Sequence, residues 1–135
     1  VDDYAHHPEE IKAVLTAVRK QYGDSRKLIA LFQPHLYTRT RDFYKEFAQS
    51  LSIADQVILL DIYPAREEPI EGITSEVIFH LLDVERKERC KLEEVVGVLA
   101  GFKTSPAVVM VMGAGDIDME LEAIVDEVKS WQHEG

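Results

Sequence analysis

The stretch Ala-Val-Val-Met-Val-Met-Gly-Ala-Gly-Asp at residues 107–116 decides the fold of this chain. Its first six residues form a continuous apolar run without alternation, which is typical of a parallel β-strand buried on both faces. The small residues that follow predict a tight turn, and the apolar spacing beyond them predicts a final helix that ends near Trp131. A buried strand that turns directly into a helix is the basic unit of an α/β fold.

The rest of the chain repeats this alternation of strand and helix. Apolar runs predict further strands at residues 28–32 and 57–62, and a weaker one at residues 90–92. Apolar residues at helical spacing predict helices at residues 8–23, 39–51, 75–83 and 93–100. We therefore predict a Rossmann-like, doubly wound α/β domain with a mainly parallel sheet and helices on both faces. Asp2 and Asp3 stand where the loop after a strand is expected, so the first strand is predicted to be truncated.

Length, charge and cysteine content narrow the class of protein. A chain of 135 residues suits one domain, and 46% hydrophobic and 30% charged residues are ordinary for a globular protein. A net charge of −10 without a basic block argues against a nucleic-acid surface, because phosphates would be repelled. No stretch approaches the roughly 18 apolar residues of a membrane span, and the lone Cys90 suits a reducing compartment. We therefore expect a single cytoplasmic domain at residues 1–135, with neither nucleic acid nor membrane as a partner.

Two polar strings at the ends of predicted elements indicate a binding site. The first is Asp-Asp-Tyr-Ala-His-His-Pro at residues 2–8, and the second is Phe-Gln-Pro-His-Leu-Tyr-Thr-Arg-Thr-Arg at residues 32–41. Ligands of open α/β sheets bind at the edge formed by the carboxyl ends of the strands. The segments at residues 62–72 and 113–116 are predicted to reach the same edge, so four segments converge there.

The residue types in the first string allow more than one use. Asp2 and Asp3 either accept hydrogen bonds from ribose hydroxyls or form the turn before the helix. His6 and His7 either contact a ligand carboxylate or phosphate, hold a metal, or cap the helix. Because neighbouring side chains diverge and metal ligands usually need wider spacing, the metal is the weakest of these interpretations.

The second string brings arginines to the start of a helix. Arg39 and Arg41 lie where positive charge is mildly unfavourable to the helix dipole, which favours anion binding over a plain surface position. The turn Gly113-Ala114-Gly115 resembles a phosphate-binding turn, but Asp118 replaces the third glycine of the dinucleotide fingerprint. Residues 97–104 resemble a Walker A loop only superficially, because Phe102 occupies its second glycine position. The sequence therefore contains no P-loop.

Taken in order, the strings at residues 2–8 and 32–42 resemble the carboxyl-terminal domain of the UDP-N-acetylmuramate–L-alanine ligases, one type of Mur ligase. Leu-Asp-Ile-Tyr-Pro-Ala-Arg-Glu-Glu-Pro-Ile at residues 60–70 and Gly-Ala-Gly-Asp-Ile at residues 113–117 also look like this family. The likeness spans nearly the whole chain. It implies the last of three domains, which follows an N-terminal UDP-sugar domain and a central P-loop ATPase domain in the same full-length chain.

The resemblance implies an ATP-dependent ligase of peptidoglycan biosynthesis, with roles in cell wall biogenesis, cell shape and cell division. The carboxylate of UDP-N-acetylmuramate would react with ATP to form an acyl phosphate, which the amino group of L-alanine would attack. ATP and Mg²⁺ would be bound mainly by the central domain, and the isolated carboxyl-terminal domain would be inactive. No catalytic residue and no metal site is therefore assigned to this domain alone.

The same likeness implies roles for residues of both strings. Tyr4, His6 and Arg39 would surround L-alanine and the reacting centre, and Asp2 or Asp3 would face the ATP ribose. An arginine suits the carboxylate of the amino acid or the developing charge on phosphate.

Many relatives carry a second arginine where this chain has Leu36. Arg39 would therefore act with His35 or Arg41 instead of with that second arginine. The walls of the site would come from the loop at residues 63–72 and from Gly113, Ala114, Gly115 and Asp116.

A receiver-type signalling module is the alternative interpretation. It also has a doubly wound sheet with paired acids near its start, and Asp61 at a strand end would be the phosphoacceptor. That scheme requires a lysine at the end of the last buried strand, where this chain has Met112-Gly113.

Overall fold

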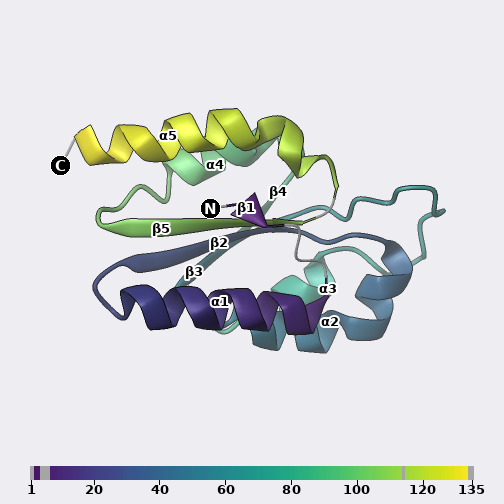
Figure 1. Ribbon diagram of the computed structural model, residues 1–135. Helices are drawn as coiled ribbons and strands as arrows, with labels where there is room; N and C mark the ends of the chain where they lie inside the picture. The colour runs from purple at the N-terminus through teal and green to yellow at the C-terminus, as the bar shows by residue number, and fades with distance from the viewer. Residues whose placement is uncertain (1, 4–6, 114, 134–135) are drawn as a thin grey trace.

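A parallel β-sheet lies between two layers of helices in the computed structural model of this chain, which describes residues 2–3, 7–113 and 115–133 (Figure 1). Within these residues the strands pair in the order β1-β5-β2-β3-β4, and every pair is parallel. Their bounds are β1 (Asp2–Asp3), β2 (Lys27–Gln33), β3 (Gln56–Leu60), β4 (Arg86–Cys90) and β5 (Ala107–Gly113).

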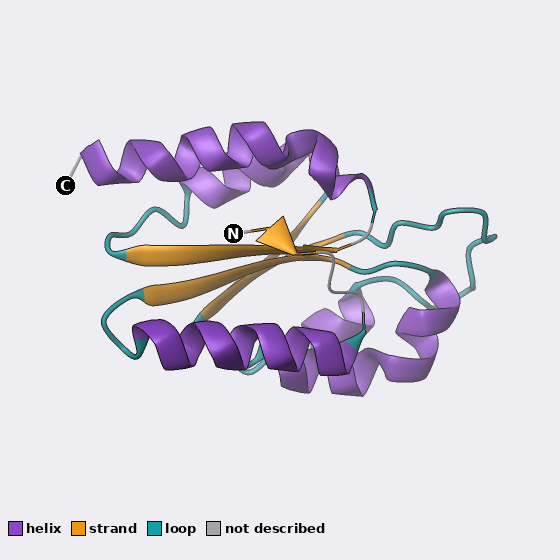
Figure 2. Ribbon diagram, in the orientation of Figure 1, coloured by secondary structure: helices purple, strands orange, loops and turns teal. Residues whose placement is uncertain are grey.

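The helices divide between the two faces of the sheet (Figure 2). One face is covered by α1 (Pro8–Tyr22), α2 (Tyr37–Leu51) and the short α3 (Glu76–Phe79). The other face is covered by α4 (Val95–Ala100) and α5 (Leu121–His133), which follow the 3₁₀ helices η1 (Leu92–Glu94) and η2 (Asp116–Glu120). The predicted doubly wound α/β fold is therefore confirmed. None of the helices in the described ranges is long and apolar enough to cross a membrane.

Alternate residues of the central strands build two separate cores. In β2, Ala30 and Phe32 pack toward α1 and α2, whereas Ile29 and Leu31 pack toward α4 and α5. All four side chains are fully buried. A strand with both faces buried is apolar at every position, which is why its sequence shows a continuous run instead of an alternation.

Two elements differ from the sequence-based expectation. The strand predicted at residues 90–92 lies at Arg86–Cys90, because this edge strand is mostly exposed and carries charged residues in place of an apolar run. The helix predicted at residues 75–83 is only one turn long, and the chain continues through tighter hydrogen bonds such as that from the Leu82 amide to the Phe79 carbonyl.

The short first strand is present as β1, paired with β5 through Asp2 opposite Val111 and Asp3 opposite Met112. The two aspartates thus lie within a strand, whereas the sequence placed them in the loop after it. This pairing puts the start of the chain beside the end of β5, as the sequence predicted for the site.

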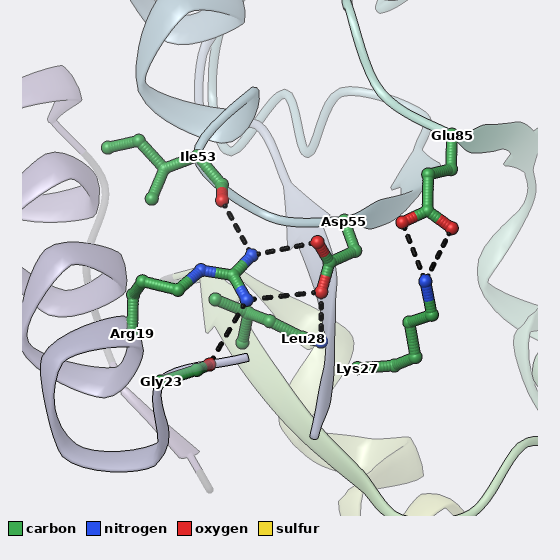
Figure 3. A network of polar contacts seen from close by, with 7 residues as sticks. All are labelled: Arg19, Gly23, Lys27, Leu28, Ile53, Asp55 and Glu85. Carbon is green, nitrogen blue, oxygen red and sulfur yellow. Dashed lines mark hydrogen bonds and ion pairs between the residues drawn. The ribbon is translucent and has the colours of Figure 1, made fainter. Parts of the chain in front are cut away.

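A polar cluster joins α1 to the amino ends of β2 and β3 (Figure 3), at the opposite end of these strands from the predicted site. The Asp55 carboxylate accepts a 2.8 Å hydrogen bond from the Leu28 amide and pairs with the Arg19 guanidinium at 3.0 Å. Arg19 also donates to the Ile53 carbonyl at 3.0 Å. Burial acts to raise the pKa of Asp55, but the hydrogen bonds from Leu28 and Arg19 outweigh it and hold the pKa below its ordinary value of 3.8.

We expect Asp55→Asn to lower the free energy of unfolding at pH 7 by about 2 kcal/mol, and Tm by roughly 8 °C. The lowered pKa means that the carboxylate stabilises the fold fully above pH 3.8. This contribution disappears as the pH falls through the folded-state pKa, so wild type and variant should converge below pH 3.8 in urea unfolding. The exposed Asp24→Asn is the matched control, and an equally large loss in it would contradict a specific role for Asp55.

Candidate functional site

The sheet has a topological switch point between β2 and β5. These strands are neighbours, yet the chain leaves β2 toward α2 on one face and leaves β5 toward η2 and α5 on the other. The two connections diverge and leave a crevice, which is where open α/β sheets bind ligands. The segment at residues 33–41, the segment at residues 62–72, and residues 113 and 115–116 all reach this edge, as the sequence predicted.

Gln33 joins the ends of the two strands across the crevice. It lies opposite Gly113 in the β2–β5 register and is only 3% exposed. Its side-chain amide donates to Asp116, and its oxygen accepts a 3.0 Å hydrogen bond from the Ile117 amide. Gly115 packs so closely that an added Cβ would lie 2.6 Å from both Gln33 Oε1 and Tyr63 Cγ. Close packing therefore holds Gly115 against Gln33 and Tyr63.

His35 and Arg39 form the charged part of the site. Arg39 lies in the first turn of α2, and its Nη1 is 3.2 Å from His35 Nδ1. Because a guanidinium only donates, this contact requires Nδ1 to accept, so a neutral His35 ring carries its proton on Nε2. The other side of the imidazole stacks on Tyr63, with ring centroids 5.7 Å apart and planes inclined by 16°.

Arg39 has no carboxylate partner within the part of the chain that the structure describes. Its side chain is nevertheless half-buried at the ligand-binding edge. A partly desolvated guanidinium without a counter-ion favours the binding of an anion, and its planar fork matches a carboxylate or a phosphate. The described site therefore presents a half-buried guanidinium, suited to an anion, beside an imidazole.

Arg41 differs from Arg39 in its surroundings. It is half exposed, and its Nε is 2.9 Å from the carboxylate of the adjacent Asp42. The hydrogen bond and the charge of Asp42 raise the pKa of the Arg41 guanidinium above its ordinary value. Arg41 therefore already has an anionic neighbour, whereas Arg39 has none among the described residues.

Several predicted site residues lie outside the residues that the structure describes. Tyr4, His6 and Ala114 belong to this group, so their assigned roles remain predictions. His7 is described, and its ring packs edge-on against Phe43 at a centroid distance of 6.4 Å. Its amide donates to Glu10 at 3.0 Å, which agrees with the expected use of one histidine at the helix start.

Two cavities of the described structure differ in their lining and in their distance from the site. A cavity of about 190 Å³ at the crevice is lined in part by Gln33, Tyr63, Lys91 and Asp116. A larger groove of about 320 Å³ between β5 and α5 is mostly apolar and lies away from these groups.

Burial raises the pKa of the Cys90 thiol to about 11, so it stays protonated at neutral pH and is a poor nucleophile.

No group of three or more histidine, cysteine or acidic side chains in the described ranges is arranged to hold a metal ion. The sequence interpretation included Gln33 and Glu67 in segments of the site but gave neither residue a role of its own. Gln33 gave one signal, because it is a polar residue at the end of an apolar strand. Glu67 gave none, because it is one of two adjacent glutamates in a charged loop.

The fold is that of a Rossmann-like α/β domain, with the half-buried Arg39 guanidinium near its switch point. Residues 1–115 match the family model described as "Mur ligase, glutamate ligase domain". The chain therefore belongs to this Mur ligase domain family. That membership leaves the receiver-type alternative without support.

Named relatives agree with this membership. The chain is 57% identical over 119 residues to a UDP-N-acetylmuramate–L-alanine ligase of Phocaeicola vulgatus, a match that covers 87% of this chain and 25% of the relative. It is 51% identical over 124 residues to the enzyme of the same name from Parabacteroides distasonis, covering 92% of this chain and 26% of the relative. The chain thus spans about a quarter of the length of these relatives.

Solved structures show the same fold. A domain assigned to a UDP-N-acetylmuramate:L-alanyl-gamma-D-glutamyl-diaminopimelate ligase from Haemophilus ducreyi matches with a TM-score of 0.69 and 21% identity, covering 94% of this chain and 88% of that one. A murein peptide ligase from Psychrobacter arcticus matches with a TM-score of 0.69 and 19% identity, covering 93% of this chain and 26% of that one. The Haemophilus structure is that of a domain solved on its own, so this fold forms without the remainder of a ligase.

Proposed function

We propose that this chain is the carboxyl-terminal domain of an ATP-dependent ligase that joins L-alanine to UDP-N-acetylmuramate in peptidoglycan biosynthesis. The named relatives at 57% and 51% identity support this activity, and their length supports further domains in the same protein. The observation that carries the proposal for the site is the half-buried Arg39 without a carboxylate partner in the described residues, at the switch point of the sheet.

In this proposal Arg39 binds the carboxylate of the incoming amino acid. Its guanidinium offers a planar pair of donors, and the contact with His35 together with the His35–Tyr63 stack limits its orientations. A bound carboxylate at Arg39 leaves the amino group free to face the activated acyl group from the partner domain. Holding the two reactants in this way lowers the entropic part of the barrier.

ATP activates the carboxylate of UDP-N-acetylmuramate, and the central domain of the whole protein would hold ATP and Mg²⁺. Asp2 and Asp3, at the carboxyl end of β1 beside β5, would contact the ribose. The whole enzyme would work in the cytoplasm, where its nucleotide substrates are made.

The test is ligation by the whole protein and by the isolated chain. We expect the whole protein, supplied with ATP, Mg²⁺, UDP-N-acetylmuramate and L-alanine, to release ADP and form UDP-N-acetylmuramoyl-L-alanine. The isolated chain should form no product and release no ADP, because a site shared between domains loses its contacts and preorganisation when one wall is missing. ATP turnover by the isolated chain, or preference of the whole protein for a different amino acid, would overturn the proposal.

A further inference from the structure

The carboxylate of Glu67 caps the amino-terminal end of α2, although it belongs to a loop thirty residues further along the chain. It accepts hydrogen bonds from the Tyr37 amide at 2.6 Å, the Thr38 amide at 3.1 Å and the Thr38 hydroxyl. The first amides of a helix have no partner within the helix, so a carboxylate there satisfies them and complements the helix dipole. Leu36, the residue at the usual capping position, has no side-chain oxygen and cannot serve.

The backbone on both sides of this contact adopts a conformation that needs support. Leu36 has φ of 75° and Ala65 has φ of 55°, and residues other than glycine rarely adopt such positive values. Two backbone hydrogen bonds lie beside them. The Leu36 amide donates to the Tyr63 carbonyl at 2.9 Å, and the Tyr63 amide donates to the Pro34 carbonyl at 2.8 Å. Glu67 and Tyr63 thus hold the loop against the β2–α2 connection at two points.

Through these hydrogen bonds Glu67 contacts the two residues that immediately precede Arg39 in the chain. Arg39 follows Thr38 in the chain and reaches back to His35, which precedes the strained Leu36. The position of Arg39 therefore depends on where α2 begins and on how Leu36 is held. Because Glu67 already accepts hydrogen bonds from the Tyr37 and Thr38 amides, an incoming anion would bind the Arg39 side chain and not these amides.

We propose that Glu67 is the positioning residue that sets Arg39 and His35 in the geometry needed to bind the amino-acid carboxylate. This inference rests on the proposed function for its substrate, but its structural part concerns Glu67, Arg39 and His35 alone. Hydrogen bonds from Thr38 chiefly, together with the Tyr37 amide and the charge of Arg41, hold the pKa of the Glu67 carboxyl below its ordinary value of 4.5. Glu67 therefore carries its charge at neutral pH.

The test compares Glu67→Gln with Glu46→Gln in the whole ligase. Glutamine can still accept from the two amides, but it carries no charge, so these bonds are no longer charge-assisted and hold the start of α2 less firmly. We expect Glu67→Gln to raise the KM for L-alanine about tenfold while the KM for ATP stays within twofold of wild type. Glu46→Gln, which changes an exposed glutamate of α2, should give wild-type values for both.

A double-mutant cycle separates positioning from a general structural role. If Glu67 acts through Arg39, Glu67→Gln should lower kcat/KM about tenfold in the wild-type background and less than twofold in an Arg39→Lys background. Equal factors in both backgrounds, or a wild-type KM for L-alanine in Glu67→Gln, would overturn the inference.

A readout without activity uses the isolated chain, whose fold has been solved on its own in a relative. We expect Glu67→Gln, and not Glu46→Gln, to shift the NMR resonance of His35 Nδ1. An unchanged resonance would overturn the positioning role even if the whole protein is an L-alanine ligase. A shifted resonance in a protein that ligates no L-alanine would instead reject the proposed function and keep the positioning role.

Discussion

Arg39→Ala in the whole ligase should lower kcat/KM for L-alanine by about a thousandfold, which corresponds to about 4 kcal/mol of lost binding and transition-state stabilisation. The reason is that the guanidinium is half-buried at the switch point and no described carboxylate neutralises it, so the substrate carboxylate would be its partner. Removing it leaves that carboxylate in a partly desolvated crevice without a counter-charge. The measurement is the rate of ADP release as a function of L-alanine concentration.

Three variants make this prediction specific. Arg39→Lys keeps the charge but loses the planar fork and should recover only part of the activity. Arg41→Ala should lose less than tenfold, because its guanidinium is already paired with Asp42 and half exposed. Lys45→Gln removes an exposed positive charge on the same helix and should behave as wild type. Full activity of Arg39→Ala would mean that another group binds the amino acid.

Phe47→Ala should lower the free energy of unfolding of this chain by about 4 kcal/mol and Tm by roughly 15 °C. Phe47 is fully buried between α2 and the sheet, with its ring 5.4 Å from that of Phe32 in β2. Truncation removes apolar burial and leaves a cavity that the surrounding strands and helices cannot fill. Urea unfolding followed by circular dichroism measures the loss.

Phe43 provides the matched control for this change. It lies one helical turn before Phe47 on α2 but is 40% exposed. Phe43→Ala should therefore lower the free energy of unfolding by less than about 1 kcal/mol, because the mutation removes little buried apolar area. Similar losses in both variants would show that α2 contributes through helix propensity and not through packing on the sheet.

The strands that the sequence identified well are the central ones. The strand predicted at residues 28–32 is observed at Lys27–Gln33, and the one predicted at residues 107–112 is observed at Ala107–Gly113. Both are buried on both faces and therefore apolar throughout, which gives the clearest pattern a strand can have. The edge strand Arg86–Cys90 has charged, exposed residues, so its sequence contains no comparable signal.

The site was only partly accessible to sequence reasoning. The polar strings identified His35 and Arg39, and the structure brings these two side chains into contact. The spacing did not show whether Arg41 joins them. In the structure its guanidinium pairs with the adjacent Asp42. Gln33 and Glu67 contact residues that lie 83 and 30 positions away in the chain. No local pattern reports a contact over such a separation.

The amino-acid sequence by itself determined the alternation of buried strands and amphipathic helices, and with it the ligand-binding edge, because hydrophobic periodicity and turn residues are local properties. The tertiary structure alone decided which polar groups meet at that edge. Strand order brings the end of β2 beside the end of β5, and the loop after β3 folds back so that Glu67 reaches the start of α2. These contacts depend on how distant segments pack in space, and their partners have no fixed spacing along the chain.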